Sequence, residues 1–376
     1  MIGNEKNVGL VIIGAGPAGI STALHLLQLD PTWSRCMILI EKEQHPRHKL
    51  CGGGLTYFGL QVLKSLGFSL PLPVPHVAIN DLHFRYQHRV FSAHGAPLVY
   101  VYHRAALDEY LVNQARQRGV VIQEHEKVLS VAPHADGVRV ETDQAIYWAK
   151  AVVGADGSKG ITRRLVSNGA GTSRTARALE IFQPVQSWGK SAQPPEVVFD
   201  FTPVQAHLQG YFWQIPMELD GLPYENRGVY DARFYQYKKC ANLPEILAAS
   251  IDKLGDELDN SEIEGHPIHL FCPRNVFSTP RMLLVGDAAG VDPLLGEGIG
   301  PALGYGAVAA RSIQQAFERD DFRFRTYRRH ILFSSVGRTL LLRYALGKLL
   351  YRYCHNPKLM SIFWYLAAKV DRIFLN

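Results

Sequence analysis

A glycine-rich turn between a buried strand and a helix constrains this chain more than any other feature of its sequence. Residues 8–13 are wholly apolar, as a strand of a parallel sheet requires, and the run GAGPAG follows directly at 14–19. A helix is predicted over 17–29 and a second apolar strand over 37–41. This βαβ order, with G-x-G-x-x-G at its first turn, predicts a fold that binds a dinucleotide; the alternative is a tight turn in an ordinary βαβ unit.

The residues of this turn have distinct physical tasks. Gly14 permits the tight turn, Gly16 lets a pyrophosphate approach the backbone, and Gly19 lets helix and strand pack closely. The free N–H groups and the positive end of the following helix attract phosphates. Glu41 ends the second strand 22 residues after Gly19, where a carboxylate can accept a hydrogen bond from a ribose 2′-hydroxyl. We therefore predict a cofactor site that contains these residues and their neighbours Ala18 and Lys42.

Two later glycine–aspartate segments each follow a predicted strand: GADGS at 154–158 and GDAAG at 286–290. Together with the N-terminal turn, this trio resembles the flavoprotein superfamily typified by p-hydroxybenzoate hydroxylase. The resemblance implies that the dinucleotide is FAD. It implies that Asp287 and Gly286 contact ribityl or ribose hydroxyls, and that Asp156 and Gly157 lie on the pyrophosphate side and near nicotinamide-cofactor contacts. A carboxylate suits sugar hydroxyls because it accepts hydrogen bonds and offers no competing donor.

The resemblance assigns further cofactor contacts. The GEGI run opens a helix whose N-terminus, by resemblance, points at the N1/O2 edge of the flavin, with contacts from Gly296, Gly298 and Ile299. A positive helix end there stabilises the anionic reduced flavin. Arg104 begins a helix that matches the family, in which the arginine lies against the cofactor; the alternative is a solvated arginine of the first turn. Val128 is expected to contact the cofactor as well.

The stretch PRHKLCGGGL, at 46–55, resembles a segment of the geranylgeranyl reductases, which are FAD enzymes that saturate prenyl chains. The resemblance implies that the glycine backbone approaches the isoalloxazine ring with no side chain in the way. It places four residues at the cofactor: Arg47, Cys51, Gly52 and Gly53. For Cys51, contact with substrate or flavin and a role as a small buried hydrophobe are both open.

A second segment, GYFWQIP at 210–216, resembles the strand that lines the substrate cavity in the same family. Tyr211 and Trp213 stand two residues apart, so they face the same side of a strand; plain core packing is the alternative. The segment is also close to the GWxWxIP segment of flavin-dependent halogenases. The halogenase stretch with its reactive lysine has no good counterpart here, since Lys49 and Lys64 lie outside the expected context.

The combined resemblance implies an FAD-dependent oxidoreductase that passes hydride from reduced flavin N5 to a carbon–carbon double bond of an isoprenoid or similar apolar substrate. Cys51, Tyr211 and Trp213 are the candidate catalytic and cavity residues, with the first two as candidate proton donors. A single G-x-G-x-x-G indicates that electrons arrive transiently from NAD(P)H or from a protein donor. Two alternatives stay open: an FAD-dependent monooxygenase of an aromatic or lipid substrate, and a non-catalytic prenyl-binding protein of the same fold.

The predicted fold class is α/β with an α+β second domain. It comprises a Rossmann-like FAD-binding domain, a mixed-sheet substrate domain and C-terminal helices. We expect the FAD-binding domain to be discontinuous, over residues 1–75, 100–170 and 276–320. The substrate domain is expected over 76–99 and 171–275, followed by a basic helical tail over 321–376.

The tail holds most of the excess positive charge. Of the chain's 40 lysines and arginines and 34 acids, residues 321–376 contain 11 and two, so the tail carries +9 and the remainder −3, for +6 overall. Its apolar, aromatic and basic composition favours helices at a membrane interface, with helices packed on the protein as the alternative. Arg338, Lys348 and Arg352 share one helical face, whereas Arg343 lies nearly opposite. Nucleic-acid binding is not expected, because no known fold for it is present.

The remaining composition limits the chemistry. The five cysteines are far apart and form no CxxC pair, which argues against a disulfide scaffold or zinc site and fits a reducing compartment. No metal site is predicted. The N-terminus has no signal-peptide pattern, and no apolar stretch of about 18 residues is free of charge. We therefore expect a cytoplasmic protein with peripheral membrane contact through residues 321–376.

Overall fold

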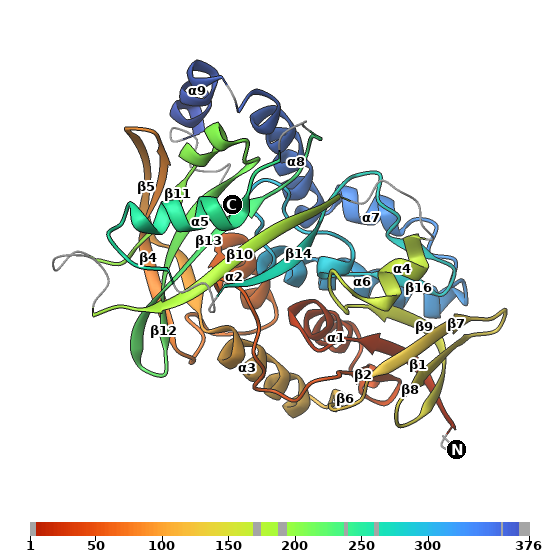
Figure 1. Cartoon of the computed structure of the whole chain (residues 1–376). Helices are drawn as coiled ribbons and strands as arrows, with labels where there is room; N and C mark the ends of the chain where they lie inside the picture. The colour runs from red at the N-terminus through yellow and green to blue at the C-terminus, as the bar shows by residue number, and fades with distance from the viewer. Residues whose placement is uncertain are drawn as a thin grey trace.

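The computed structural model describes residues 5–167, 174–186, 194–236, 240–258, 263–354 and 356–367. Within these residues the strands form two eight-stranded sheets. In Figure 1 the first sheet lies near the N-terminus with helices α1 and α3, and the second rises from it toward α8 and α9. The predicted α/β architecture with a second, mixed sheet is confirmed.

The first sheet is built around the predicted βαβ unit. Its strands run in the order β15-β16-β9-β1-β2-β6, with β1 parallel to both β2 and β9. Strand β8 pairs antiparallel with β9, and β7 with β8. The predicted strands at 8–13 and 37–41 are confirmed. The bounds are β1 Glu5–Ile13, β2 Met37–Ile40, β6 Val121–Gln123, β7 Val128–Pro133, β8 Val138–Thr142, β9 Ile146–Gly154, β15 Ser278–Thr279 and β16 Met282–Leu284.

Helix α1 (Pro17–Leu29) packs closely against α6 (Ile299–Arg319). The Ser21 hydroxyl donates to the Leu303 carbonyl at 2.6 Å, and a Cβ on Gly306 would stand 2.3 Å from the Ser21 Oγ. This close approach near the start of both helices sets their N-terminal ends side by side. The other helices before the C-terminal segment are α2 Tyr57–Ser65, α3 Arg104–Gln117, α4 Ile161–Ser167 and α5 Leu243–Asp252, with short 3-10 turns η1 Pro31–Arg35, η2 Thr202–Ala206 and η4 Gly286–Ala288.

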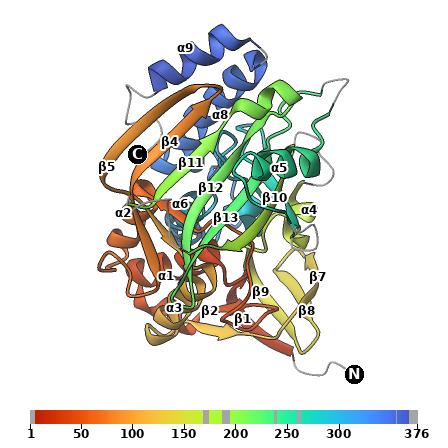
Figure 2. The ribbon, with the colours of Figure 1, turned by 60° about the vertical axis from the view of Figure 1, so that its left-hand side comes forward.

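The second sheet runs in the order β14-β10-β13-β12-β11-β4-β5-β3. Its long strands β4, β5, β11, β12, β13 and β10 lie side by side in Figure 2. The strand expected just before Arg104 is the end of β5, so it belongs to this sheet and leads into α3 through His103. The bounds are β3 Gly54–Thr56, β4 His76–Tyr86, β5 Arg89–Tyr102, β10 Arg174–Pro184, β11 Glu196–Asp200, β12 Gly210–Leu219, β13 Leu222–Asp231 and β14 Glu264–Leu270.

The segment after residue 320 is helical as predicted, and much of it is buried. Its helices are α7 Tyr327–Phe333, α8 Ser335–Tyr353 and α9 Pro357–Ala367. Trp364 of α9 is fully buried and stacks on Phe84 of β4, with ring centroids 5.0 Å apart. Figures 1 and 2 both show α8 and α9 at the end of the second sheet far from the N-terminus. The end of the predicted tail, 368–376, lies outside the described residues.

Candidate active site

The GAGPAG turn is locked against the first sheet. Gly14 has a φ of +106°, and a Cβ there would stand 2.4 Å from the carbonyl oxygen of Ala155. A Cβ on Gly19 would stand 2.0 Å from the carbonyl oxygen of Gly14. Only glycine fits at either position, because a side chain would overlap backbone atoms that cannot move aside. The tight turn and the close helix packing expected of these glycines are therefore present.

Gly16, by contrast, borders open space. Of the described atoms, only the Nη2 of Arg47 lies within 4 Å of where a Gly16 Cβ would stand, at 3.7 Å. Gly298, at the start of α6, is similarly open, and its nearest such atom is the Oδ1 of Asp287 at 3.8 Å. A cation beside one open glycine suits a phosphate, and a carboxylate beside the other suits a sugar hydroxyl. Each glycine thus lies beside a charge of the kind that one part of a dinucleotide needs.

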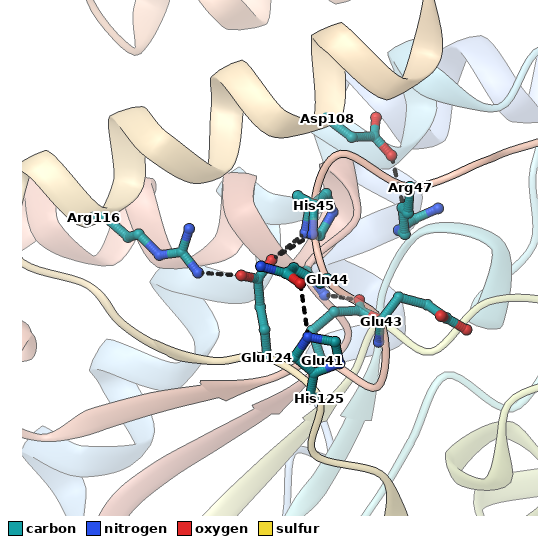
Figure 3. A network of polar contacts seen from close by, with 10 residues as sticks. Glu41, Glu43, Gln44, His45, Arg47, Asp108, Arg116, Glu124 and His125 are labelled. Atoms are coloured by element: carbon teal, nitrogen blue, oxygen red, sulfur yellow. Dashed lines mark hydrogen bonds and ion pairs between the residues drawn. The ribbon is translucent and has the colours of Figure 1, made fainter.

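The loop that carries Arg47 is fixed by the polar network in Figure 3. Glu124 accepts hydrogen bonds from the His45 backbone N–H at 2.9 Å and from the Arg116 guanidinium at 2.5 Å. Burial opposes ionisation of Glu124, but hydrogen bonds from Arg116 and His45 lower its pKa overall. Gln44 is also tied to His125, at 2.8 Å. The loop after β2 is therefore held in place before it reaches the cofactor side.

Arg104 and Arg47 share one buried carboxylate. The Asp108 side chain accepts from Arg104 at 3.0 and 2.9 Å and from Arg47 at 3.1 Å. Burial alone would lower the pKa of the Arg104 guanidinium, but Asp108 and then Cys51 raise it overall, so the group stays charged. Arg104 is 7% exposed and is thus not the solvated first-turn arginine of the alternative interpretation. Asp108 was missed from the sequence, although its i,i+4 spacing from Arg104 was a readable signal.

The remaining predicted cofactor residues have different surroundings. A Cβ on Gly286 would stand 2.6 Å from the Ala18 Cβ, which joins the GDAAG segment to the first turn. The Glu41 carboxylate accepts a hydrogen bond from the Ala15 N–H at 2.8 Å, so it stabilises the GAGPAG turn. Lys42 is exposed and pairs with Glu43 at 3.3 Å. Val128 is half-buried at the start of β7.

Asp156 has a local partner within its own loop. Its carboxylate accepts from the Thr162 backbone N–H at 3.0 Å and from the Thr162 hydroxyl, at the start of α4. Burial raises the pKa of Asp156, although the Thr162 hydrogen bonds oppose this. Gly157 has a φ of +79° and open space around it. Asp156 thus shapes the loop that abuts Gly14, and its predicted contact with the cofactor stays a prediction.

An apolar cavity of about 1030 Å³, open mouth included, unites the other predicted segments. The CGGG segment, the aromatic strand β12 and the start of α6 all contribute to its wall. The predicted residues in this wall are Cys51, Gly52, Gly53, Tyr211, Trp213, Gly296, Gly298 and Ile299. Among the residues that the structure describes, no cluster of three or more His, Cys, Asp or Glu is arranged to hold a metal ion.

The consecutive glycines of this wall are required by protein contacts as well. A Cβ on Gly52 would stand 2.7 Å from the Ile215 side chain and 3.1 Å from the Asn226 Oδ1. Gly53 has a φ of +71°, and its Cβ would stand 2.1 Å from the carbonyl oxygen of Tyr102. Trp213 donates from its Nε1 to the same Asn226 Oδ1 at 2.7 Å. Glycine here lets the loop lie directly on the second sheet.

A buried charge cluster closes the cavity from the side of the C-terminal helices. Arg343 of α8 is 1% exposed and donates to Asp292 at 2.9 Å and to Glu297 at 2.5 Å. Burial would lower the pKa of Arg343, but Asp292 and Glu297 raise it, so the guanidinium is charged. Thr56 donates to the other Glu297 oxygen at 2.7 Å. Tyr211 donates its hydroxyl to the Leu295 carbonyl in the same wall.

Several wall residues could not be assigned from the sequence. Glu297 stood within a predicted segment, but its partner Arg343 lies in the basic tail. The one available signal was that Arg343 lies off the basic face of its helix, and a lone charge on the opposite face is often buried and paired. Glu180 and His266 also line the cavity, from β10 and β14, and no motif marks either of them.

The described residues therefore fit FAD. Arg47 lies beside the open Gly16 and Asp287 beside the open Gly298, and the start of α6 and the CGGG segment border the apolar cavity. Comparison with known proteins agrees: the FAD binding domain family matches residues 7–304. An uncharacterised protein of Methanosarcina barkeri is 29% identical over 356 residues, 92% of this chain and 84% of that protein. A menaquinone reductase of Mycolicibacterium smegmatis is 27% identical over 324 residues, covering 80% and 75%.

The same fold occurs in proteins with different reactions. A geranylgeranyl bacteriochlorophyll reductase-like protein of Thermoplasma acidophilum superposes with a TM-score of 0.76 at 18% identity, covering 99% of this chain and 97% of that one. A digeranylgeranylglycerophospholipid reductase of Methanosphaera stadtmanae is 23% identical over 338 residues, 85% of this chain and 80% of that protein. A halogenase superposes with a TM-score of 0.69 at 16% identity, covering 98% and 83%. The fold is thus shared across reductases and halogenases, and the reaction must be argued from the site.

Proposed function

The chain belongs to the FAD binding domain family, and from this premise we propose that it reduces carbon–carbon double bonds in an isoprenoid or similarly apolar substrate. The observation that carries the proposal is the apolar cavity beside the start of α6. Its wall is mostly aliphatic and aromatic, with Phe84, Phe199 and Trp213 among its members. Such a wall suits a hydrocarbon chain, because transfer of apolar surface from water to an apolar wall is favourable.

When bound, FAD supplies a hydride equivalent for transfer to one carbon of the double bond. The chain's own residues bind, orient and shield the reactants. Arg47 and the N-terminus of α1 would hold the pyrophosphate, and Asp287 the sugar hydroxyls. The N-terminus of α6 places partial positive charge beside the cavity. The aromatic wall orients the substrate and excludes water, which would otherwise act as an unselective proton donor.

The names of two relatives support the substrate class. One is a menaquinone reductase and another a digeranylgeranylglycerophospholipid reductase. Both names describe reduction of a molecule with a long apolar chain. We propose that electrons reach the flavin transiently from NAD(P)H or from a protein donor, since the chain has a single G-x-G-x-x-G.

The test is anaerobic. The FAD-loaded protein is reduced with dithionite, and a geranylgeranyl-bearing glycerophospholipid is then added without O2. The proposal expects the flavin absorbance to return to the oxidised form and the product mass to rise by two hydrogens. A flavin that stays reduced until O2 is admitted, with oxygen then found in the product, would contradict it and favour the monooxygenase. Failure of the purified protein to retain FAD would favour the prenyl-binding alternative.

We also propose peripheral contact between the C-terminal helices and an anionic lipid surface. Exposed apolar side chains on α8 and α9 lie among exposed basic ones: Leu342, Leu349, Tyr353, Leu359, Ile362, Tyr365 and Leu366, with Arg338, Lys348, Arg352 and Lys358. Apolar and basic groups together favour binding at a lipid interface. No helix among the described residues is long and apolar enough to cross a membrane.

Vesicle sedimentation tests this contact. The wild type should bind phosphatidylglycerol vesicles better than phosphatidylcholine vesicles, and salt should weaken the binding. Leu349→Asp should reduce binding about tenfold, because it places a charge in the apolar part of the surface. Leu222→Asp is the control, since Leu222 is equally exposed but lies at the turn into β13. Equal binding by the two variants would contradict a contact through α8 and α9.

A further inference from the structure

One carboxyl group in the cavity wall has an oxygen without a hydrogen bond. Glu180 of β10 is 1% exposed, and its Oε2 accepts from the Asn226 Nδ2 at 2.8 Å. Within the described part of the chain, no hydrogen bond reaches its Oε1. The Nδ1 of His266 lies 3.6 Å from this oxygen, and His266 also lines the cavity. Glu297, the other carboxyl of the wall, is different because Thr56 and Arg343 each bond one of its oxygens.

The hydrogen-bond chain fixes which Glu180 oxygen can carry a proton. The indole Nε1 of Trp213 can only donate, and it donates to the Asn226 Oδ1 at 2.7 Å. The Asn226 amide is thereby oriented with its Nδ2 toward Glu180. Because that N–H donates to Oε2, a proton on the carboxyl is favoured on Oε1. The acidic hydrogen therefore belongs to the oxygen that faces neither Asn226 nor Trp213.

The surroundings raise the pKa of this carboxyl, so that a large fraction of it is protonated near neutral pH. Burial raises the pKa of Glu180 to about 7, against the opposing effects of Asn226, Lys49 and Arg104 and with a smaller contribution from Glu264. His266, in the adjacent strand, is neutral, because burial and the charge of Lys49 lower its pKa to about 4, only partly offset by Asp287. The side chain of His266 is 24% exposed, so it connects buried Glu180 with solvent.

We propose that Glu180 is the acid that protonates the substrate, and that His266 returns the proton from solvent; this assignment rests on the proposed double-bond reduction. A hydride equivalent from reduced FAD adds two electrons and a hydrogen to one alkene carbon. The Oε1–H bond of Glu180 breaks, its electron pair stays on the carboxylate, and the proton forms the C–H bond at the other carbon. The carboxylate then takes up one proton through the His266 imidazole, and the product is the alkane plus oxidised flavin.

The two donors predicted from the sequence are less suited to this step. The Tyr211 hydroxyl donates to the Leu295 carbonyl, and burial raises its pKa well above the ordinary value. Its proton is therefore already donated in a hydrogen bond, and it is only weakly acidic. The Cys51 sulfur accepts a hydrogen bond from the Gly53 N–H at 3.4 Å and lies beside Arg104, so it is placed to contact cofactor or substrate.

The test combines a titration and a transient rate. Infrared difference spectra of the oxidised FAD-loaded protein should show a protonated-carboxyl C=O band that titrates near pH 7. Glu180→Gln should abolish this band. It should also slow alkene-dependent reoxidation of the dithionite-reduced flavin about 100-fold, with FAD content unchanged. Glu264→Gln is the matched control, because Glu264 is the register partner of Glu180 on β14 but is exposed. It should keep the rate and the band, and the band should titrate slightly lower because the charge of Glu264 makes a small contribution to the raised pKa of Glu180.

The His266 assignment has its own readout. His266→Asn should leave the first turnover intact and slow the later ones, because only reprotonation depends on it. Reoxidation of the Glu180→Gln protein at the wild-type rate, or a Glu180 band already lost at pH 5, would overturn the assignment while leaving the reductase function standing. A wild-type protein that reoxidises with O2 but never with an alkene would overturn the reductase function, and the assignment with it.

Discussion

We call the GAGPAG turn, with the GADGS and GDAAG segments that pack against it, the cofactor cradle. The cradle and the substrate cavity are built in opposite ways. The cradle comes from short contiguous runs in which glycine is required by backbone contact, as Gly14 against Ala155 shows. The cavity comes from side chains far apart in the chain, from Cys51 on the first loop to Arg343 on α8. A site made of backbone leaves a motif in the sequence, whereas a site made of assembled side chains leaves almost none.

The largest effect should come from the buried charge cluster of the cavity. Arg343→Met removes the only cation bonded to Asp292 and Glu297 in the hydrogen bonds of the described residues, leaving two buried carboxylates. We expect the free energy of unfolding to fall by roughly 3–5 kcal/mol, as when one partner of a buried ion pair is lost. Urea denaturation measures it. Arg338→Met, on the exposed face of the same helix, should change little. Equal losses of stability in Arg343→Met and Arg338→Met would show that the buried ion pairs of Arg343 do not stabilise the fold.

The second effect concerns pH and the cavity carboxyl. The pKa of Glu180 is raised to about 7 in the folded chain, above its ordinary value of 4.5. Between these values the unfolded chain releases the proton and the folded chain keeps it, so the free energy of unfolding falls as pH rises. Its full contribution is present below pH 4.5 and is lost above about pH 7, on the order of 3 kcal/mol.

Chemical denaturation at several pH values measures this loss. His266 and His269, whose pKa values burial lowers to about 4, give the opposite slope over the same interval, so the wild type is compared with Glu180→Gln. The stability of the wild type relative to Glu180→Gln should fall by about 3 kcal/mol between pH 4.5 and 7, since the amide does not ionise. Glu264→Gln should retain most of this fall. Parallel curves for the wild type and Glu180→Gln would show that the cavity carboxyl ionises like a surface glutamate.

The third effect tests the backbone logic of the cradle. Gly14→Ala places a Cβ 2.4 Å from the Ala155 carbonyl at a positive φ, so it should cost roughly 2 kcal/mol or more and abolish FAD binding. Gly16→Ala meets only the end of Arg47, so it should keep the wild-type stability and weaken FAD binding alone. Thermal unfolding and flavin fluorescence separate the two results. Loss of stability in both variants would mean that Gly16 is also a packing glycine.

The cradle and the fold class were predictable because each signal is local. The first 41 residues contain two apolar runs, the G-x-G-x-x-G spacing and a glutamate at the end of the second run. These local patterns predicted β1, α1, β2 and the turn between β1 and α1. The second sheet was predicted as strands, but its order was not, because pairings such as β11 with β4 join segments more than 100 residues apart. Nothing in a single strand indicates such a partner.

The cavity was predicted only where a resemblance supplied the residues, as for Tyr211 and Trp213. Glu180 follows an apolar residue in an ordinary strand, and the Asn226 that binds it comes from β13. Arg343 looked like an imperfection in an otherwise basic face, and the structure shows it to be the one tail arginine that reaches the cavity wall in the described residues. Exceptions to a surface pattern were thus better guides to the cavity than the pattern itself.

The smallest effect is expected in the loop of Figure 3, which connects the cradle to the cavity wall. Its backbone leads from the cradle to the CGGG wall, but the side chain of Glu124 holds it. Glu124→Gln keeps the size and loses the charge-assisted bond to Arg116, so FAD affinity should fall by about 1 kcal/mol, or roughly fivefold, with the fold intact. Glu43→Gln, exposed in the same loop, should leave the affinity unchanged. If Glu124→Gln binds FAD normally, Glu124 is not needed to position Arg47, and the loop backbone together with Asp108 is sufficient.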